Sequence, residues 1–174
     1  MLKKIFKYFR DKFLKNKIND SLKILKSSDR TFSKPINKIG CIIDTNLEID
    51  YYQILELIEK IGLKEKDIKI ISFSDTDFND PFSKMRISNE SINFYGNIVS
   101  NDANEFISYD YDLLINYFGD NKILTLISSK VNSKFRVGFD NTNKDINDII
   151  FSNIFNNFAK FSSELIKYLQ KIKW

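Results

Sequence analysis

Short groups of carboxylate and amide residues follow the apolar runs of this sequence, and they are the residues best suited to hold a ligand. The candidates are Asp44, Asn46, Asp75, Asp77, Asn116, Asp120 and Asp140. Their oxygens could bind Mg²⁺ or form hydrogen bonds with sugar hydroxyls. The same residue types also turn the chain and cap helices after strands. Because such loops favour Asp and Asn anyway, the structural interpretation carries more weight, and we predict neither a metal nor a cofactor.

The sequence lacks several residues and motifs that common chemistries need. It has no histidine, which excludes Ser-His and Cys-His nucleophile pairs and histidine metal ligands. Its single cysteine, Cys41, lies in an apolar run and is expected to be a buried, inert thiol. No G-x-G-x-x-G motif follows the first apolar run, and no P-loop motif occurs. These absences favour a protein that is not an enzyme.

Alternating apolar runs and helical patterns predict the elements that position the candidates. Apolar runs predict strands at 38–44, 67–75, 111–118 and 134–140, with an edge strand at 145–151. Helices are expected after the first and third strands, with Gly62 as a stop for one and Asp120 as the N-cap of the other. This order predicts an α/β fold, a single Rossmann-like three-layer domain with a mostly parallel sheet.

Two further carboxylates, Asp110 and Asp112, flank the start of the third predicted strand. Ligands of open α/β sheets bind beyond the carboxyl ends of the strands. This pair therefore lies at the wrong edge for a site, and we expect both side chains to be solvated.

The amino-terminal segment differs from the rest of the chain in charge. Residues 1–38 hold 12 Lys and Arg against 3 Asp, whereas the whole chain carries a net charge of +4. The remaining residues are therefore net acidic. Apolar residues recur at helical spacing at Leu2, Ile5, Phe6, Phe9 and Phe13, which predicts a basic amphipathic helix. We expect a helical arm and linker over 1–34 and an α/β domain over 35–174.

Three interpretations of this helix stay open. It can pack on its own domain or on a protein partner such as a twin subunit, since an apolar stripe at helical spacing is most often part of a core. It can lie on an anionic membrane with its apolar face down. RNA binding ranks third, because the phenylalanines share one face and no RNA-binding motif occurs. The candidate binding residues are Lys3, Lys4, Phe6, Lys7, Phe9, Arg10 and Phe13.

The segment YDLLINYFGDNKILTLISSKVNSKFRVGFD (111–140) resembles part of the heptosyltransferase-like GT-B glycosyltransferases. The resemblance implies a Rossmann-like unit and a sugar or nucleotide-sugar ligand. Those enzymes also have a second Rossmann-like domain, for which this chain has no room. Their first strand is followed by a loop with a glycine, which CIIDTNLEID lacks. No catalytic role is therefore carried over.

Taken whole, the chain resembles a family of uncharacterised proteins of flavobacteria and other Bacteroidota. The resemblance includes the basic amino-terminal helix, an aromatic-glycine segment (Phe94, Tyr95, Gly96), the DLLI strand and the KFRVG strand, and it implies no activity. We predict a cytoplasmic, non-enzymatic binding or accessory module, peripheral at the inner membrane. The alternatives are a reduced glycosyltransferase-like domain that binds a sugar or nucleotide sugar, and an RNA- or ribosome-associated protein.

Overall fold

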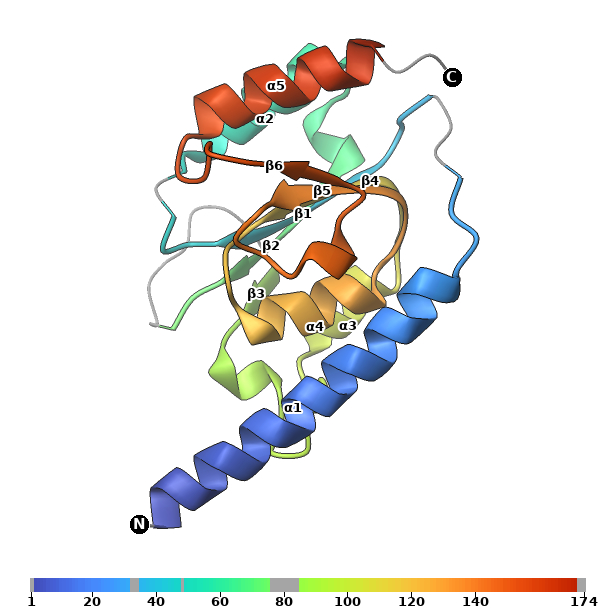
Figure 1. Cartoon of the computed structure of the whole chain (residues 1–174). Coiled ribbons are helices and arrows are strands. Elements are labelled where there is room, and N and C mark those ends of the chain that lie inside the picture. Colours follow the sequence, from blue (N-terminus) through green and yellow to red (C-terminus); the bar gives the residue numbers. More distant parts are fainter. Residues whose placement is uncertain (1, 32–34, 48, 76–84, 172–174) are drawn as a thin grey trace.

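The fold is built on one parallel sheet. The computed structural model describes residues 2–31, 35–47, 49–75 and 85–171, and the side chains from residue 4 onward. Six strands pair in the order β3-β2-β1-β4-β5-β6, and every pairing is parallel (Figure 1). They are β1 (Ile39–Asp44), β2 (Ile68–Phe73), β3 (Met85–Ile87), β4 (Asp110–Tyr117), β5 (Asn132–Phe139) and β6 (Ile149–Phe151). The predicted Rossmann-like α/β fold is confirmed.

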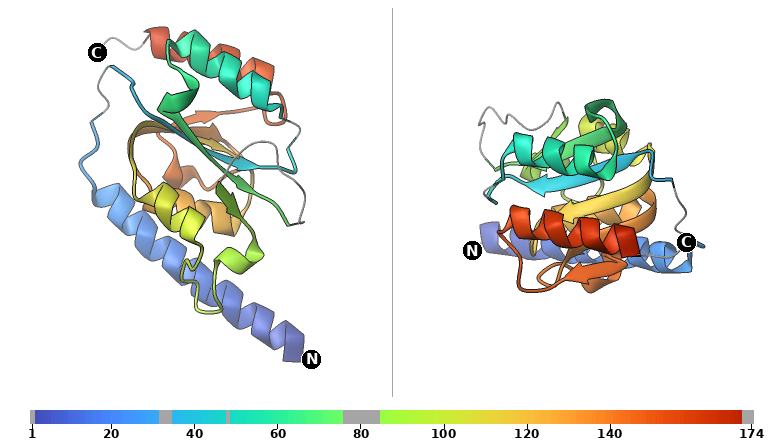
Figure 2. Two further views of the ribbon diagram at one scale, coloured as in Figure 1. Left: turned by 180° about the vertical axis from the view of Figure 1, so that it is seen from behind. Right: turned by 90° about the horizontal axis from the view of Figure 1, so that it is seen from above.

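Helices cover both faces of this sheet, so the protein has three layers (Figures 1 and 2). One face carries α2 (Tyr51–Ile61) and α5 (Phe158–Lys171); the other carries α1 (Leu2–Ser27), α3 (Asn101–Ile107) and α4 (Lys122–Lys130). Short 3₁₀ turns lie at Glu65–Asp67, Asn89–Ser91 and Lys144–Ile146. Because helices cover both faces, most residues of the central strands are apolar. These strands could therefore be recognised in the sequence as apolar runs.

Local capping signals explain most element ends. Asp50 and Gln53 form a capping box at the start of α2, and Gly62 ends this helix in the left-handed conformation, as predicted. The N-cap of α4 is Asn121 and not Asp120. The Asn121 Oδ1 accepts hydrogen bonds from the backbone N–H groups of Ile123 (3.0 Å) and Leu124 (3.2 Å), so the prediction for Asp120 was wrong by one residue.

Asp112 was predicted to be solvated, and this was wrong. The carboxylate is buried; it accepts hydrogen bonds from the backbone N–H groups of Asn37 (2.8 Å) and Lys38 (3.0 Å) and pairs with the Lys134 Nζ at 2.8 Å. Burial alone would raise the pKa of Asp112, but the Lys134 ammonium and the two N–H groups outweigh it and lower that pKa. Asp112 thus ties the entry of β1 to the start of β4, whereas Asp110 is exposed as expected.

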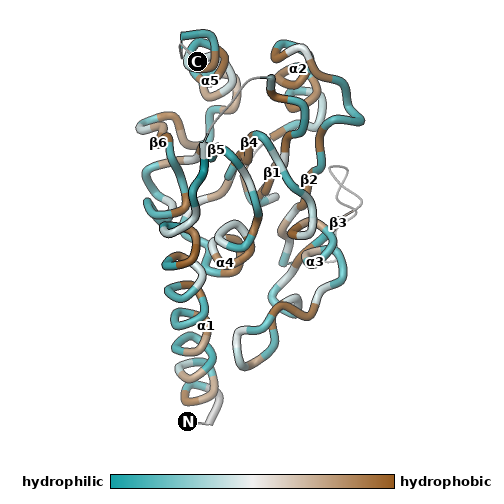
Figure 3. The backbone as a smooth tube through the Cα atoms, turned by 90° about the vertical axis from the view of Figure 1, so that its right-hand side faces the viewer, coloured by the Kyte–Doolittle hydropathy of each residue, from teal (hydrophilic) through white to brown (hydrophobic). Residues whose placement is uncertain are grey.

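Helix α1 has two apolar stripes that face different sides. Leu14, Ile18, Leu22 and Leu25 are buried in the core between the sheet and the helices α3 and α4. The stripe of the first half is left largely exposed, and Figure 1 shows these first turns extending past the rest of the domain. Figure 3, coloured by hydropathy, shows apolar positions along both halves. The second half of α1 is therefore part of the core.

The neighbours Leu22 and Ile24 test this difference, because Leu22 is 6% exposed and Ile24 is 71% exposed. We expect Leu22→Ala to lower the free energy of unfolding by about 2–5 kcal/mol through the cavity it leaves. Ile24→Ala, on the same helix, should change it by less than about 0.5 kcal/mol. Urea denaturation measures both; equal losses would contradict the assignment.

Candidate functional site

The segment between β3 and α3 holds the first half of α1 in place, and Gly96 makes the closest approach. Gly96 has a positive φ of 78°, and a Cβ at this position would lie 3.1 Å from the Lys17 Cγ and 3.2 Å from the Leu14 Cα. Both the conformation and the contact favour glycine. The close approach to α1 explains why a glycine follows the two aromatic residues noted in the sequence.

The aromatic neighbours of Gly96 extend this contact along α1. The ring of Phe94 lies 5.7 Å from that of Phe6 and 5.8 Å from that of Phe13, both edge to face, and Tyr95 lies 5.7 Å from Phe13. Such pairs each add about 0.5–1.5 kcal/mol beyond the burial of area. Four rings, two on each side, therefore fix the direction in which the first turns of α1 project.

Arg10 adds a polar anchor to the same contact. Its guanidinium donates hydrogen bonds to the backbone carbonyl oxygens of Asn89 (2.5 Å) and Ile92 (3.3 Å). The next residue, Asp11, pairs with the Lys122 Nζ at 3.7 Å, at the start of α4. The candidate Arg10 thus has a structural role in positioning α1.

The apolar side chains in the first half of α1 nevertheless remain largely exposed to solvent. The exposed fractions are 47% for Ile5, 60% for Phe6, 45% for Phe9 and 37% for Phe13; these four residues are called the docking stripe below. Exposed lysines at positions 4, 7, 12 and 15 lie on the other faces of the helix, and none of them has an ion pair within the described residues. The side chain of Lys3 lies outside the described part. The docking stripe is thus an apolar, partly exposed face of a helix whose other faces are basic.

The strand-end candidates meet the arm in one cavity of about 800 Å³. Asn46, Asp75 and Asp120 line it from the sheet side, and Phe6, Lys7 and Arg10 line it from α1. The cavity lies beyond the carboxyl ends of β1 and β4, where the strand order reverses, the usual ligand position in such sheets. Two sets of candidates that are far apart in the sequence are therefore brought together.

The other strand-end candidates have structural partners or lie elsewhere. The Asp44 Oδ1 accepts hydrogen bonds from the backbone N–H (3.0 Å) and the side-chain amide (2.8 Å) of Asn46, a turn interaction. Asn116 is fully buried and bonds to Ser128 and Asn147 in the core. Asp140 is exposed and does not line this cavity, and Asp77 lies outside the described residues.

Groups for metal or thiol chemistry do not gather in the described part of the chain. No cluster of three or more carboxylate or thiolate ligands occurs there. Cys41 is buried as predicted, and burial raises the pKa of its thiol, which keeps it protonated. None of the described helices is long and apolar enough to cross a membrane.

One buried cation was missed at the sequence level. Arg136 on β5 is fully buried, and its guanidinium donates hydrogen bonds to the carbonyl oxygens of Ser128 (2.7 Å) and Val131 at the end of α4. Burial, with a smaller contribution from Arg30, lowers the pKa of Arg136 to about 9, and Asp148 opposes this shift. The signal was a single arginine inside the apolar run KFRVGF.

Comparison with known proteins gives the family. The model of a family of unknown function, DUF6913, matches residues 10–172. The chain belongs to DUF6913. This confirms the expectation of an uncharacterised family, while the resemblance to glycosyltransferases stays a prediction. No curated protein and no solved structure matches this DUF6913 chain.

Gly96→Ala tests the contact that orients the arm. Alanine would be strained at this positive φ and would press on the α1 backbone at Leu14. We expect faster amide hydrogen exchange at residues 8–13 and a free energy of unfolding lower by about 1–3 kcal/mol. Gly62→Ala is the matched control, because Gly62 also has a positive φ but has no atom within 4 Å of the added Cβ. Unchanged exchange in Gly96→Ala would contradict the role.

Proposed function

We propose that this DUF6913 protein is a non-enzymatic binding module that docks on an anionic membrane surface through the first half of α1. The observation that carries the proposal is the docking stripe, in which Phe6 and Phe9 are 60% and 45% exposed, on a helix whose other faces carry lysines without an ion pair in the described part of the chain. A helix with one apolar and one basic face lies in the membrane interface and binds anionic headgroups. The first turns of α1 extend past the rest of the domain (Figure 1), and the segment at Phe94 and Tyr95 covers part of the stripe at Phe6 and Phe13.

The binding free energy expected from the docking stripe and the lysines fits a reversible association with a membrane. Full burial of a Phe or Ile side chain contributes about 1.5–3 kcal/mol, and each lysine near an anionic surface contributes about 1 kcal/mol. The docking stripe is already partly covered by Phe94 and Tyr95, so it gains less than full burial. A few apolar side chains and several lysines together support peripheral binding that weakens with salt.

The observations favour a membrane over the two other interpretations. Burial in the protein's own core accounts for the second half of α1 but leaves the docking stripe exposed. RNA stacking needs rings that lie along a basic groove, whereas here Ile5, Phe9 and Phe13 share one face of α1 and the lysines lie on others. Apolar side chains gathered on one helix face suit a membrane interface better than a strand of bases.

Ile5→Ser/Phe9→Ser tests the proposal by co-sedimentation with anionic and neutral vesicles. Both side chains are nearly half exposed, and among the described residues the ring of Phe9 pairs with Tyr8 and not with Phe94 or Tyr95, so the fold should be unchanged. We expect the wild type to pellet with anionic vesicles at low salt, and the variant to bind at least ~10-fold more weakly, since each lost side chain contributes more than about 1 kcal/mol.

Tyr52→Ser on α2 is the matched control, because Tyr52 is 76% exposed but lies on the opposite face of the sheet. It should bind like the wild type. Vesicle binding that the Ile5→Ser/Phe9→Ser change leaves intact would reject the proposal. A wild type that pellets with RNA and not with vesicles would favour the RNA-associated alternative.

Binding of a sugar or nucleotide sugar is a second candidate function, favoured by the cavity of about 800 Å³ at the switch point of the sheet. Asn46 and Asp120 offer hydrogen-bond partners for hydroxyls there, and Lys7 offers a cation for a phosphate. A nucleotide sugar should then raise the melting temperature, and Asn46→Ala/Asp120→Ala should abolish the rise. Asp140→Ala, at a strand end outside the cavity, is the control. A melting temperature that no nucleotide sugar changes would exclude this candidate.

A further inference from the structure

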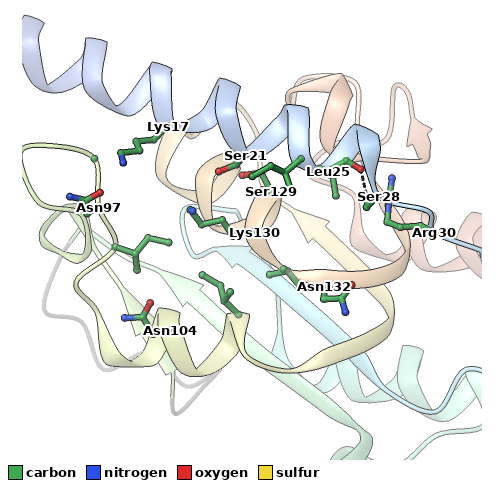
Figure 4. A pocket seen from close by; sticks show the side chains of 15 residues that line it. Lys17, Ser21, Leu25, Ser28, Arg30, Asn97, Asn104, Ser129, Lys130 and Asn132 are labelled. Atoms are coloured by element: carbon green, nitrogen blue, oxygen red, sulfur yellow. Dashed lines mark hydrogen bonds between the residues drawn. The ribbon is translucent and has the colours of Figure 1, made fainter.

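A second cavity, of about 600 Å³, opens beside the second half of α1 (Figure 4). Its walls are α1, the segment around Gly96, α3 and the end of α4. Its volume is within the range of small-molecule sites. Neither the docking stripe nor the strand-end candidates line it, so it is separate from both sites described above.

The charged groups of this cavity all have the same sign. Lys17, Arg30 and Lys130 line it, and none of the described residues that line it is a carboxylate. Lys17 and Lys130 have no ion pair within the described residues. The two terminal nitrogens of Arg30 bond to Asp148 at 3.0 and 2.9 Å, while its buried Nε has no partner in the described part.

Neutral donors add to these cations. Ser21 is buried, and its hydroxyl forms no hydrogen bond within the described residues; the side-chain amides of Asn97 and Asn104 form none either. Figure 4 shows Ser21, Lys17, Asn97 and Asn104 around the same space. These three side chains can therefore donate hydrogen bonds to a ligand, and they line the same cavity as the cations.

The carboxyl ends of two helices border the cavity, but their carbonyl groups do not neutralise its positive charge. The carboxyl ends of α1 and α4 would each present partly negative carbonyl groups. At α4, the buried Arg136 guanidinium satisfies the carbonyl oxygens of Ser128 and Val131. At α1, Ser28 caps the carbonyl of Leu25 with its hydroxyl at 2.6 Å (Figure 4). Arg136 also adds a cation behind the cavity wall.

We infer that this cavity binds a phosphate group. Phosphate accepts several charge-assisted hydrogen bonds at once, which matches two unpaired ammonium groups and three unused neutral donors. The apolar walls at Ile98 and Ile107 suit an organic group attached to the phosphate. The phosphate can belong to a soluble compound or to a lipid headgroup, and the helix geometry bears on this choice.

Part of the docking stripe lies in line with the cavity along α1. Phe6 and Ile24 are 18 residues apart, which is about five turns, so they lie on one line along the helix. Lys17 falls within about 20° of that line, and Lys17 and Ile24 both line the cavity. A membrane contacted by the docking stripe would therefore present its headgroups at the cavity; this lipid assignment, unlike the phosphate site itself, rests on the proposed function.

Nuclear magnetic resonance titration with inorganic phosphate at constant ionic strength tests the site. Saturable shifts are expected at the amide signals of Ser21, Asn97 and Lys130. Lys17→Gln/Lys130→Gln should weaken the binding at least ~10-fold through the loss of two charged donors, and both residues are exposed, so the fold should be kept. Lys64→Gln/Lys66→Gln is the matched control, because these exposed lysines also have no ion pair in the described part of the chain and do not line the cavity.

Phosphate shifts that are absent, or that Lys17→Gln/Lys130→Gln leaves unchanged, would overturn the inference. Dihexanoyl phosphatidic acid, a soluble lipid, separates the two sources: tighter binding than inorganic phosphate supports a headgroup, and equal binding supports a soluble phosphate compound. Ile5→Ser/Phe9→Ser should keep the phosphate shifts even if it abolishes vesicle binding. The phosphate titration and the vesicle assay can therefore fail independently of each other.

Discussion

The period of helix α1 is the constraint on which the rest of this structure depends. Each residue turns the helix by about 100°, so Phe9 and Leu14, five residues apart, point about 140° away from each other. The layer formed by α3 and α4 buries the stripe that begins at Leu14, and the same surface cannot reach Phe9. A second apolar stripe on the same helix therefore remains outside the core.

The segment around Gly96 makes this exposed half a rigid feature of the molecule. Phe94, Tyr95 and the carbonyl groups that Arg10 contacts hold α1 at its middle, and Gly96 allows the backbones to touch. The same segment forms one wall of the polar cavity. One loop thus sets the direction of the docking stripe and also shapes the proposed phosphate site.

The sequence predicted those features that depend on neighbours along the chain. The strands and the stop at Gly62 follow from apolar runs and a helix-ending residue. The solvation of Asp112 was mispredicted because its partner Lys134 comes from a neighbouring strand, 22 residues later. Asp120 and Asn121 are both good caps, so composition alone could not choose between them.

The residues of the candidate site could be identified from the sequence, but their positions relative to one another could not. The exposed phenylalanines and the strand-end residues were both identified from their pattern. That Phe6 and Asn46 line one cavity depends on where α1 crosses the domain, and helical periodicity carries no such information. The polar cavity beside Lys17 was not foreseen, because its donors come from four separate segments.

The central claim, that one side of α1 faces a membrane, is tested most directly with single fluorescent labels. Cys41 is buried, so a polarity-sensitive dye will react with a cysteine introduced at Phe9, Ile24 or Tyr52. With anionic vesicles, the account predicts a blue shift of the emission at positions 9 and 24 and none at position 52. A label at position 9 that stays in water, or equal shifts at 9 and 52, would contradict the account.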